Sequence, residues 1–445
     1  MKNNQPAKIL KIAILSDFTI RGLKEELEKS CANISIHAQI YEGGYNQIHQ
    51  EFVAENSGLN KFKPEATFLI TSNKFALGDG EIKIFQNKKE RINYADEQVN
   101  SFIETVNLFL KNTSGVLVVS NLKQNSYSPL GINEDKIEFS AKDLPDYFNE
   151  KIKSEFIKNS RVRIYDFNSF FLRFGEENII NEKLRYLGDI YISPDYIPQL
   201  AEDLMGYIKP LVSKNRKCIV LDLDNTLWGG VVGEDGFNNI KLDNNPPGNA
   251  FLEFQKHLLA LHQKGMILAV NSHNNPEDAL QVIREHPQMI LKEKHFACIK
   301  VNWKNKVDNL IKIAEEINIG LDSLVFIDDD PVNRELVKKH LPEVLVIDLP
   351  EDSSLYVKTL KKLNDFHTLQ LTEEDFQKGE MYSQQRQRND SKEKIKNLDD
   401  FLKSLDTEVT IAKATDFTLP RISQLTMKTN QFNLTTRRYK EEDVK

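Results

Sequence analysis

Short apolar runs alternate with stretches of helical periodicity along the first 210 residues of the chain. The apolar runs predict buried strands, and the stretches between them, where apolar residues recur every three or four positions, predict amphipathic helices. The predicted strands cover residues 8–15, 34–40, 66–70, 115–120 and 161–165. The predicted helices cover residues 21–31, 45–53, 96–110, 147–157 and 198–211. Because this alternation is typical of parallel strands joined by right-handed crossovers, residues 1–211 are predicted to form one α/β domain.

After a basic run at residues 213–217 the same alternation starts again. Its predicted strands cover residues 218–223, 266–270, 296–301, 324–327 and 344–347. Its predicted helices cover residues 251–264, 276–285, 304–316 and 332–340. Residues 212–350 are therefore predicted to form a second doubly wound domain with a parallel sheet.

Beyond residue 350 the chain becomes polar and helix-prone. Residues 353–405 predict a helical connector, and residues 421–439 begin a new element. We therefore expect residues 351–445 to comprise a helical connector and the start of a truncated further domain. The predicted fold class is α/β, with two doubly wound, Rossmann-like parallel-sheet domains followed by a helical C-terminal segment.

The composition describes a soluble globular protein, with 40% hydrophobic and 28% charged residues. A formal net charge of -7 argues against bulk attraction to nucleic acid or to an anionic membrane. The three cysteines, Cys31, Cys218 and Cys298, follow no metal-ligand spacing, and so sparse a set suits a reducing compartment. No signal peptide or bilayer-spanning segment is recognisable, so a cytoplasmic location is expected.

Acidic residues follow two of the predicted strands in the second domain. In VLDLDNTLWGG, Asp222 and Asp224 lie two positions apart at a strand end, which places them on the same side by the period of a strand. A second cluster, at residues 328–330, follows the strand 324–327. A pair of solvated turn carboxylates is the simpler interpretation of either cluster alone. Because strand-end ligands gather at one edge of an open α/β sheet, the two clusters together predict a Mg²⁺ site.

Two further polar residues stand at the expected places around these acids. Ser272 follows the strand 266–270, where its hydroxyl and the next backbone N–H groups could hold phosphate oxygens. Lys306 lies at the start of a helix and offers a compact positive charge. Taken alone, Ser272 would be a turn or cap residue and Lys306 a surface lysine. Both residues lie between the two acidic clusters in the sequence, each at a strand end or a helix start, and this arrangement favours a phosphoryl-transfer site.

The segment DLDNTLW resembles motif I of the haloacid dehalogenase (HAD) superfamily, and Ser272, Lys306 and Asp328-Asp329 are similar to motifs II, III and IV. This resemblance implies that Asp222 attacks phosphorus and that Asp224 acts as general acid and base. It also implies that Mg²⁺ is bound by the Asp222 and Asp328 carboxylates and by the backbone carbonyl of Asp224.

The same resemblance assigns the remaining site residues. Lys306 would offset charge on the transferring group, and Asp329 would support Lys306 or a metal-bound water. The substrate-binding residues would be Thr226, Ser272, His273 and Asn274. The gaps between the motifs leave no room for an inserted cap domain, so the core is predicted to be capless and its site open.

The longer segments LDLDNTLWGGVVGEDG, NWKNKVDNL, FIDDDPVNREL and RISQLTMKTNQFNLTTRRY together resemble the FkbH-like family, a group with phosphatases of subfamily IIIC type. Members that load a glyceryl group onto a carrier protein have a Cys just before the motif II Ser, where this chain has Asn271. Members also continue into a GNAT-like acyltransferase domain, which here would be truncated.

The resulting prediction is a Mg²⁺-dependent phosphatase or phosphotransferase that acts on a phosphorylated metabolite through an aspartyl phosphate. Family context implies polyketide or surface-polysaccharide biosynthesis. The alternatives are glyceryl transfer from a phosphorylated glycerate to an acyl carrier protein and a non-catalytic scaffold that binds phospho-ligands. Besides the substrate, the candidate partners are an acyl carrier protein and a second copy of the chain, with no nucleic acid and no membrane.

The first domain resembles SGNH-type hydrolases, with Ser16-Asp17 at the end of its first strand. Where those enzymes carry Asp and His three residues apart, this chain has Asp189 and Ile192. Without a nearby His no base is available, so the domain is predicted to be non-catalytic.

Overall fold

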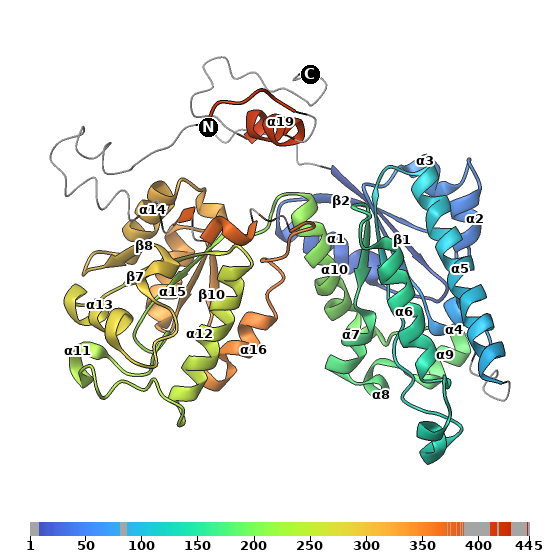
Figure 1. Ribbon diagram of the computed structural model, residues 1–445, viewed down its shortest axis with the longest axis horizontal. Coiled ribbons are helices and arrows are strands. Elements are labelled where there is room, and N and C mark those ends of the chain that lie inside the picture. Colours follow the sequence, from blue (N-terminus) through green and yellow to red (C-terminus); the bar gives the residue numbers. More distant parts are fainter. Residues whose placement is uncertain are drawn as a thin grey trace. The chain divides into compact units, whose positions relative to one another are not determined.

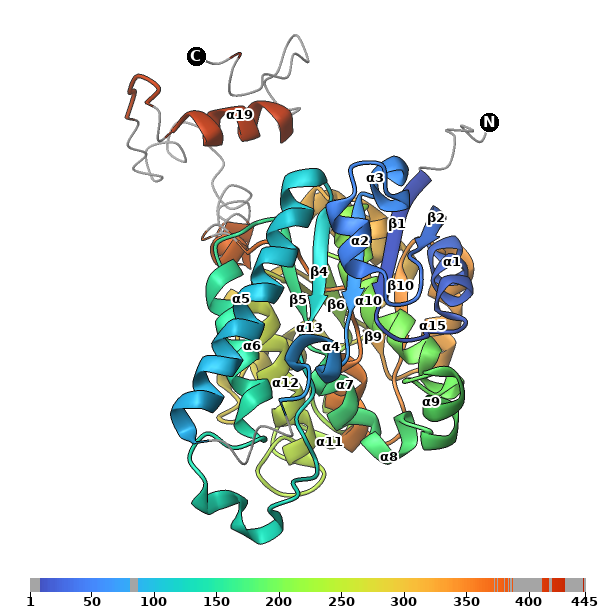
Figure 2. The same cartoon turned by 90° about the vertical axis from the view of Figure 1, so that its right-hand side faces the viewer.

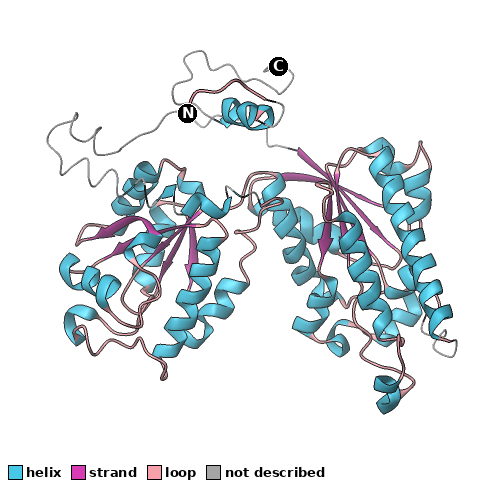
Figure 3. Ribbon diagram, in the orientation of Figure 1, coloured by secondary structure: helices cyan, strands magenta, loops and turns pink. Residues whose placement is uncertain are grey.

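The computed structural model describes residues 9–80, 87–371, 410–415 and 418–428, with shorter runs between 373 and 386 and residue 443. Residues 1–384 form one compact unit that holds both sheets, and residues 385–445 form a second unit. The structure confirms the α/β class: each of two parallel sheets has five strands with helices around it (Figures 1 and 3).

The first sheet has the strand order β2-β1-β3-β4-β5, and all its pairings are parallel. Its strands are β1 (Ile9–Ser16), β2 (His37–Glu42), β3 (Ala66–Ile70), β4 (Val116–Ser120) and β5 (Val162–Tyr165). Its α-helices are α1 (Leu23–Asn33), α2 (Ile48–Val53), α3 (Gly58–Phe62), α4 (Asn73–Leu77), α5 (Lys88–Asn112), α6 (Asp143–Phe156), α7 (Phe167–Phe174), α8 (Glu176–Ile179), α9 (Glu182–Gly188) and α10 (Ile197–Leu211). Two 3₁₀ turns are η2 (Gly131–Lys136) and η3 (Pro194–Tyr196).

Alternate residues of the strands in this sheet face two separate cores. On β1, Ile12 and Ile14 belong to the core that α1 and α10 cover, whereas Ala13 and Leu15 belong to the core that α5 and α6 cover. Figure 2 shows these helix pairs on opposite sides of the strands. Burial on both faces explains why all five residues of the central strand β3 are buried, as expected for a doubly wound sheet.

The second sheet has the order β10-β9-β6-β7-β8 and is also entirely parallel. Its strands are β6 (Cys218–Leu221), β7 (Ile267–Ser272), β8 (Phe296–Val301), β9 (Leu324–Asp328) and β10 (Leu345–Asp348). Its α-helices are α11 (Val232–Asp235), α12 (Gly248–Gln263), α13 (Pro276–Glu285), α14 (Lys306–Ile317), α15 (Pro331–His340) and α16 (Tyr356–Lys361). Short 3₁₀ turns are η4 (Glu293–His295), η5 (Leu321–Ser323) and η6 (Ser353–Leu355).

This sheet also separates two cores. Ile219 and Leu221 of β6 pack in the core formed with α12, α13 and α16, and Val220 packs in the core formed with α14 and α15. Residues 216–371 are all described, and they contain no inserted cap domain. Within residues 216–371, the carboxyl edge of this sheet therefore carries loops and no inserted domain.

The long helix α5 differs most from the expected boundaries in the first domain, since it begins eight residues before the predicted start at residue 96. Asn87 caps it by accepting a hydrogen bond from the Glu90 backbone N–H, and the Glu90 side chain accepts one from the Asn87 backbone N–H. Its first turns carry few apolar residues, and the buried Arg91 takes an inward position. A pattern that relies on apolar residues therefore places the helix start too late.

Beyond the second sheet, the structure describes only parts of the predicted helical connector. The helix α19 (Leu419–Lys428) lies in the second compact unit and begins two residues before the predicted element at 421–439. Residues 387–405 of the expected connector and residues 429–439 of that element lie outside the described residues. Across the described part of the chain, no helix is both apolar and long enough to cross a bilayer.

Candidate active site

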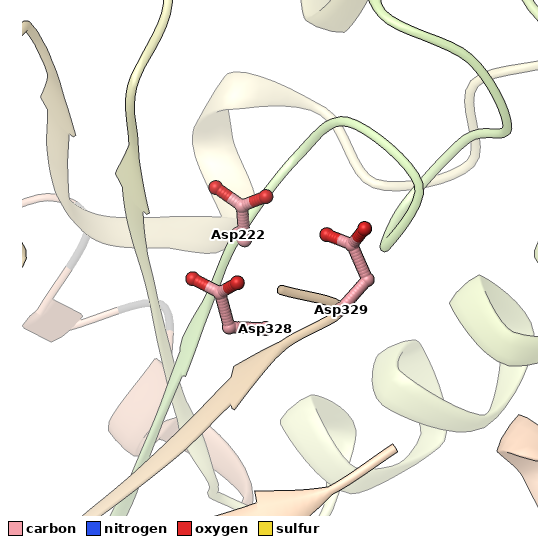
Figure 4. Close-up of side chains that lie close together, drawn as sticks. All are labelled: Asp222, Asp328 and Asp329. Atoms are coloured by element: carbon pink, nitrogen blue, oxygen red, sulfur yellow. The ribbon is translucent and has the colours of Figure 1, made fainter. Parts of the chain in front are cut away.

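The two acidic clusters meet at the carboxyl edge of the second sheet. β6 ends at Leu221, whose neighbour in β9 is Ile327, so Asp222 and Asp328 emerge side by side. The carboxylates of Asp222, Asp328 and Asp329 each offer an oxygen, and these oxygens lie within 4.8 Å of one another. Figure 4 shows the three side chains facing a common space. The predicted convergence of the strand-end acids is therefore present in the fold.

Lys306 places its ammonium group between two of these carboxylates. Its Nζ lies 2.7 Å from Asp222 Oδ1 and 2.5 Å from Asp328 Oδ2, and its side chain is only 2% exposed. The lysine is the first residue of α14, which Asn305 caps by accepting from the Val307 N–H. Burial by itself would lower the pKa of Lys306, but the two carboxylates outweigh it and hold the pKa above its ordinary value.

The charges of this cluster do not balance. One ammonium faces three carboxylates, and burial together with the Asp222 charge raises the pKa of Asp328. Burial and the neighbouring charges of Asp222 and Asp328 raise the pKa of Asp329 to about 7. Crowded, buried carboxylates of this kind repel one another unless a cation joins them. Hard oxygen donors in this number fit a divalent cation such as Mg²⁺, and the residues present therefore suit the predicted cofactor.

Asp224 lies outside the group of three carboxylates that meet. Its Oδ1 accepts hydrogen bonds from Trp228 Nε1 at 2.8 Å and from the Val232 N–H at 3.2 Å. Its Oδ2 accepts from Asn274 Nδ2 at 2.8 Å. Burial raises the pKa of Asp224 even though these three donors and Lys306 counteract it. A carboxyl group held in this way is fixed in direction and can carry a proton more readily than an exposed one.

The four residues predicted to bind substrate all surround this edge. Ser272 is the last residue of β7 and is buried, and Asn274 is held against Asp224. Thr226 is fully buried, with its Oγ1 3.5 Å from Asp329 Oδ1. The ring Nε2 of His273 lies 2.8 Å from the Lys304 carbonyl oxygen. Their assignment to substrate remains a prediction.

Asn271, at the position where carrier-loading relatives would have a thiol, is fully buried. Its Nδ2 donates to the Lys306 carbonyl at 2.9 Å, and its Oδ1 accepts from Asn309 Nδ2 at 3.1 Å. The amide therefore joins the end of β7 to the first turns of α14, and it positions the backbone that carries Lys306. The presence of Asn rather than Cys at position 271 could be read from the sequence. Its hydrogen bond with Asn309 could be found only from the fold.

Sequence reasoning also missed the residues that hold the acids in place. Trp228 lies in the motif DLDNTLW, but its hydrogen bond to Asp224 cannot be predicted from the motif. Arg334 donates from Nη1 to the backbone carbonyls of Asp328 and Asp329, at 2.8 and 2.6 Å. In the sequence, Arg334 follows Asp328 by six residues in a predicted helix, which is the feature that could have suggested a contact with the strand end.

The buried environments of the three cysteines make them unsuitable as nucleophiles. All three are buried, and none of them forms a disulfide. Burial raises the pKa of the Cys31 thiol to about 11 and that of Cys218 further still. Cys298 Sγ donates to Glu316 at 3.0 Å, on β8. A buried thiol with a raised pKa is inert, so Cys31 and Cys218 offer no ready thiolate. The Cys298 thiol is buried and its hydrogen bond is already made to a carboxylate.

The first sheet carries a cavity of about 1100 Å³ at the ends of its strands. Asp17, in its wall, accepts hydrogen bonds from the Ser72 N–H at 2.8 Å and from Ser72 Oγ at 2.5 Å. Ser16 Oγ accepts from the Phe18 N–H at 3.2 Å, as expected for a turn residue. The described residues that line this cavity include no histidine.

Replacement of Lys306 by methionine is expected to destabilise the fold when Mg²⁺ is absent. The change leaves Asp222 and Asp328 buried without their counter-charge, and breaking a buried ion pair costs about 3–5 kcal/mol. Urea unfolding with and without Mg²⁺ measures the effect, and added Mg²⁺ should recover part of the loss. Lys304→Met, at an exposed neighbouring position, is the control. Equal stability of the two variants would show that Lys306 does not stabilise the fold by neutralising Asp222 and Asp328.

Known proteins resemble this chain both in a family model and among solved structures. Residues 11–209 match the family model described as the FkbH N-terminal domain. Among solved structures, the chain is similar to the N-terminal part of the Bacteroides fragilis protein BF1531, which contains a phosphatase domain and is complexed with Mg. The identity is 28% and the TM-score 0.75, covering 82% of this chain and 95% of the other. No curated protein matches the chain. Residues 11–209 are therefore similar to the FkbH N-terminal domain, and the likeness to the BF1531 structure extends over 82% of the chain.

Proposed function

We propose that the chain is a Mg²⁺-dependent phosphatase of the HAD type, acting on a phosphorylated metabolite through an aspartyl phosphate on Asp222. The strongest support for this proposal is the set of three carboxylates whose oxygens lie within 4.8 Å of one another, with the Lys306 ammonium between two of them. The likeness to a phosphatase-domain structure complexed with Mg supports the same assignment. Asp222 and Asp328, with the backbone carbonyl of Asp224, are the proposed metal ligands, and Asp329 is a further candidate because its carboxylate joins the group.

In the first step, a carboxylate oxygen of Asp222 forms a bond to phosphorus and the bond from phosphorus to the ester oxygen breaks. Asp224 donates its proton to that leaving oxygen. Its raised pKa suits it to this role, and its three hydrogen bonds fix its direction. Bound Mg²⁺ supplies charge stabilisation to the transferring group, and Lys306 adds a second positive charge beside Asp222.

In the second step, Asp224, now a carboxylate, takes a proton from water as the water oxygen attacks phosphorus. The bond between phosphorus and the Asp222 oxygen breaks, which releases inorganic phosphate and restores the carboxylate. Ser272 and the N–H groups after it are proposed to hold the phosphate oxygens, with Thr226, His273 and Asn274 around them. Water is the acceptor in this scheme because Asn271 carries no thiol and all three cysteines are buried.

Glyceryl transfer to an acyl carrier protein is the alternative, and it requires such a thiolate. A panel of phosphorylated sugars and acids, assayed with Mg²⁺ for phosphate release, tests the phosphatase directly. Phosphorylated glycerate supplied together with an acyl carrier protein separates the two reactions, with both phosphate and protein mass followed. Free phosphate without an adduct supports the proposal, and a glyceryl adduct on any cysteine overturns it. No turnover with any substrate would favour a scaffold that binds phospho-ligands.

For the rest of the molecule we propose the arrangement expected from the sequence. Residues 1–211 would form a non-catalytic, SGNH-like domain, residues 212–350 the catalytic domain, and residues 351–445 a connector that leads into an acyltransferase-like region. Polyketide or surface-polysaccharide biosynthesis is the proposed context.

A further inference from the structure

Trp303 is a large aromatic side chain that is exposed beside the candidate active site. It lies in the loop between β8 and α14, three residues before Lys306, and 76% of its surface is exposed. Because consecutive Cα atoms are 3.80 Å apart, the Cα atoms of Trp303 and Lys306 are separated by about 11 Å at most. The other tryptophan of the chain, Trp228, is fully buried.

The loop that carries Trp303 is fixed at several points. The Asn302 N–H donates to the Ser272 carbonyl at 3.1 Å, and Asn302 Oδ1 accepts from the Lys304 N–H at 2.9 Å. The Lys304 carbonyl in turn lies 2.8 Å from His273 Nε2. The exposed indole is therefore presented by a backbone that is tied to the end of β7, where Ser272 lies.

His273 extends the indole into a larger surface. Its ring is stacked on Trp303, with the two centroids 6.4 Å apart and the planes inclined by 23°. We call these two rings the aromatic shelf. One ring belongs to the residue after Ser272 and the other to the loop before Lys306, so the shelf lies beside the space where the phosphoryl group is proposed to bind. Since residues 216–371 contain no cap domain, no domain inserted in that range covers the shelf.

We propose that the aromatic shelf binds a ring with an apolar face in the organic part of the substrate, so that the site favours phosphate esters of sugars or other cyclic alcohols over short open-chain esters. The inference rests on the proposed function and adds the substrate class to it. An exposed indole gains apolar contact when a ring covers it, whereas a short chain such as a glyceryl group presents no face to cover it.

The kinetic test compares cyclohexyl phosphate, phenyl phosphate and ethyl phosphate with the wild-type chain, Trp303→Ala and Trp303→Phe. For cyclohexyl phosphate, Trp303→Ala should lower kcat/KM about tenfold, mainly through KM, which corresponds to about 1.4 kcal/mol. The Phe variant should recover most of this loss, and ethyl phosphate should lose less than twofold. Tyr186→Ala, which removes an exposed aromatic side chain from α9, is the control. Equal losses for all three esters, or none, would overturn the inference. A loss confined to phenyl phosphate would also overturn it, because a sugar face is saturated.

A binding measurement separates this inference from the proposed function. The fluorescence of Trp303 should shift to shorter wavelength when cyclohexylphosphonate binds in the presence of Mg²⁺, and methylphosphonate should not produce that shift. Trp303→Phe identifies the signal, since it leaves only the buried Trp228. A shift without hydrolysis of any ester would retain the shelf and reject the phosphatase. Hydrolysis without a shift would reject the shelf and retain the phosphatase.

Discussion

Replacement of Asp222 by asparagine is expected to lower kcat for phosphate release by roughly 10⁴-fold or more, since losses of this order follow removal of a catalytic nucleophile. An amide oxygen is a far poorer nucleophile than a carboxylate, and no second carboxylate can take over without moving. Asp328 is held by Lys306 and by the Asp330 N–H, and Asp224 is held by Trp228 and Asn274. The rate is measured by phosphate release with p-nitrophenyl phosphate.

Asp308→Asn provides the matched control for this variant. Asp308 is exposed on α14, two residues from Lys306, so its change alters the same helix without touching the cluster of carboxylates. Circular dichroism and thermal unfolding establish that Asp222→Asn is folded. Retention of most of the wild-type kcat by a folded Asp222→Asn protein would mean that another residue attacks phosphorus.

Removal of divalent cations is expected to lower phosphatase activity by roughly 10³-fold, because a bound metal supplies several kcal/mol of transition-state stabilisation. Three crowded carboxylates, two of them buried, repel one another when a single lysine is their counter-charge, and EDTA restores that state by removing the metal. Activity should return when Mg²⁺ is added in excess, and EDTA already saturated with Mg²⁺ should have no effect.

A second readout of the metal does not depend on turnover. Mg²⁺ should raise the thermal unfolding temperature of the wild-type chain, because a ligand that binds only the folded state stabilises it. Asp328→Asn should remove most of that increase. Full activity after dialysis against EDTA would exclude the metal from the mechanism, whatever the unfolding temperature shows.

Much of the fold follows from apolar runs and helical periods in the sequence. The predicted ranges 66–70, 276–285 and 296–301 coincide with β3, α13 and β8. These elements are bounded by polar residues, and Pro276 begins α13 directly after its Asn275 cap. Local signals suffice there because the cap or the change in polarity lies next to the element itself.

The strand ends of the candidate site could also be predicted, because parallel strands bring their carboxyl ends to one edge. That rule placed Asp222 and Asp328 near each other, and the structure pairs their strands directly. It could not give the bonds from Trp228 and Asn274 to Asp224, or the link from Asn271 to Asn309. These contacts depend on how loops fold back across the sheet edge, for which a single sequence has no periodic signal.

The central claim is that Asp222 becomes phosphorylated, and the most direct test is to trap that species. Asp224→Asn with p-nitrophenyl phosphate and Mg²⁺ should form the aspartyl phosphate, because this leaving group departs without a proton. The same variant lacks the base that activates water, so the intermediate should persist. After an acid quench, mass spectrometry should find one phosphoryl group on the chain, located by peptide mapping at Asp222 and missing from the Asp222→Asn/Asp224→Asn double variant. A phosphoryl group on another residue, or phosphate release by Asp224→Asn at the wild-type rate with none on the chain, would contradict the account.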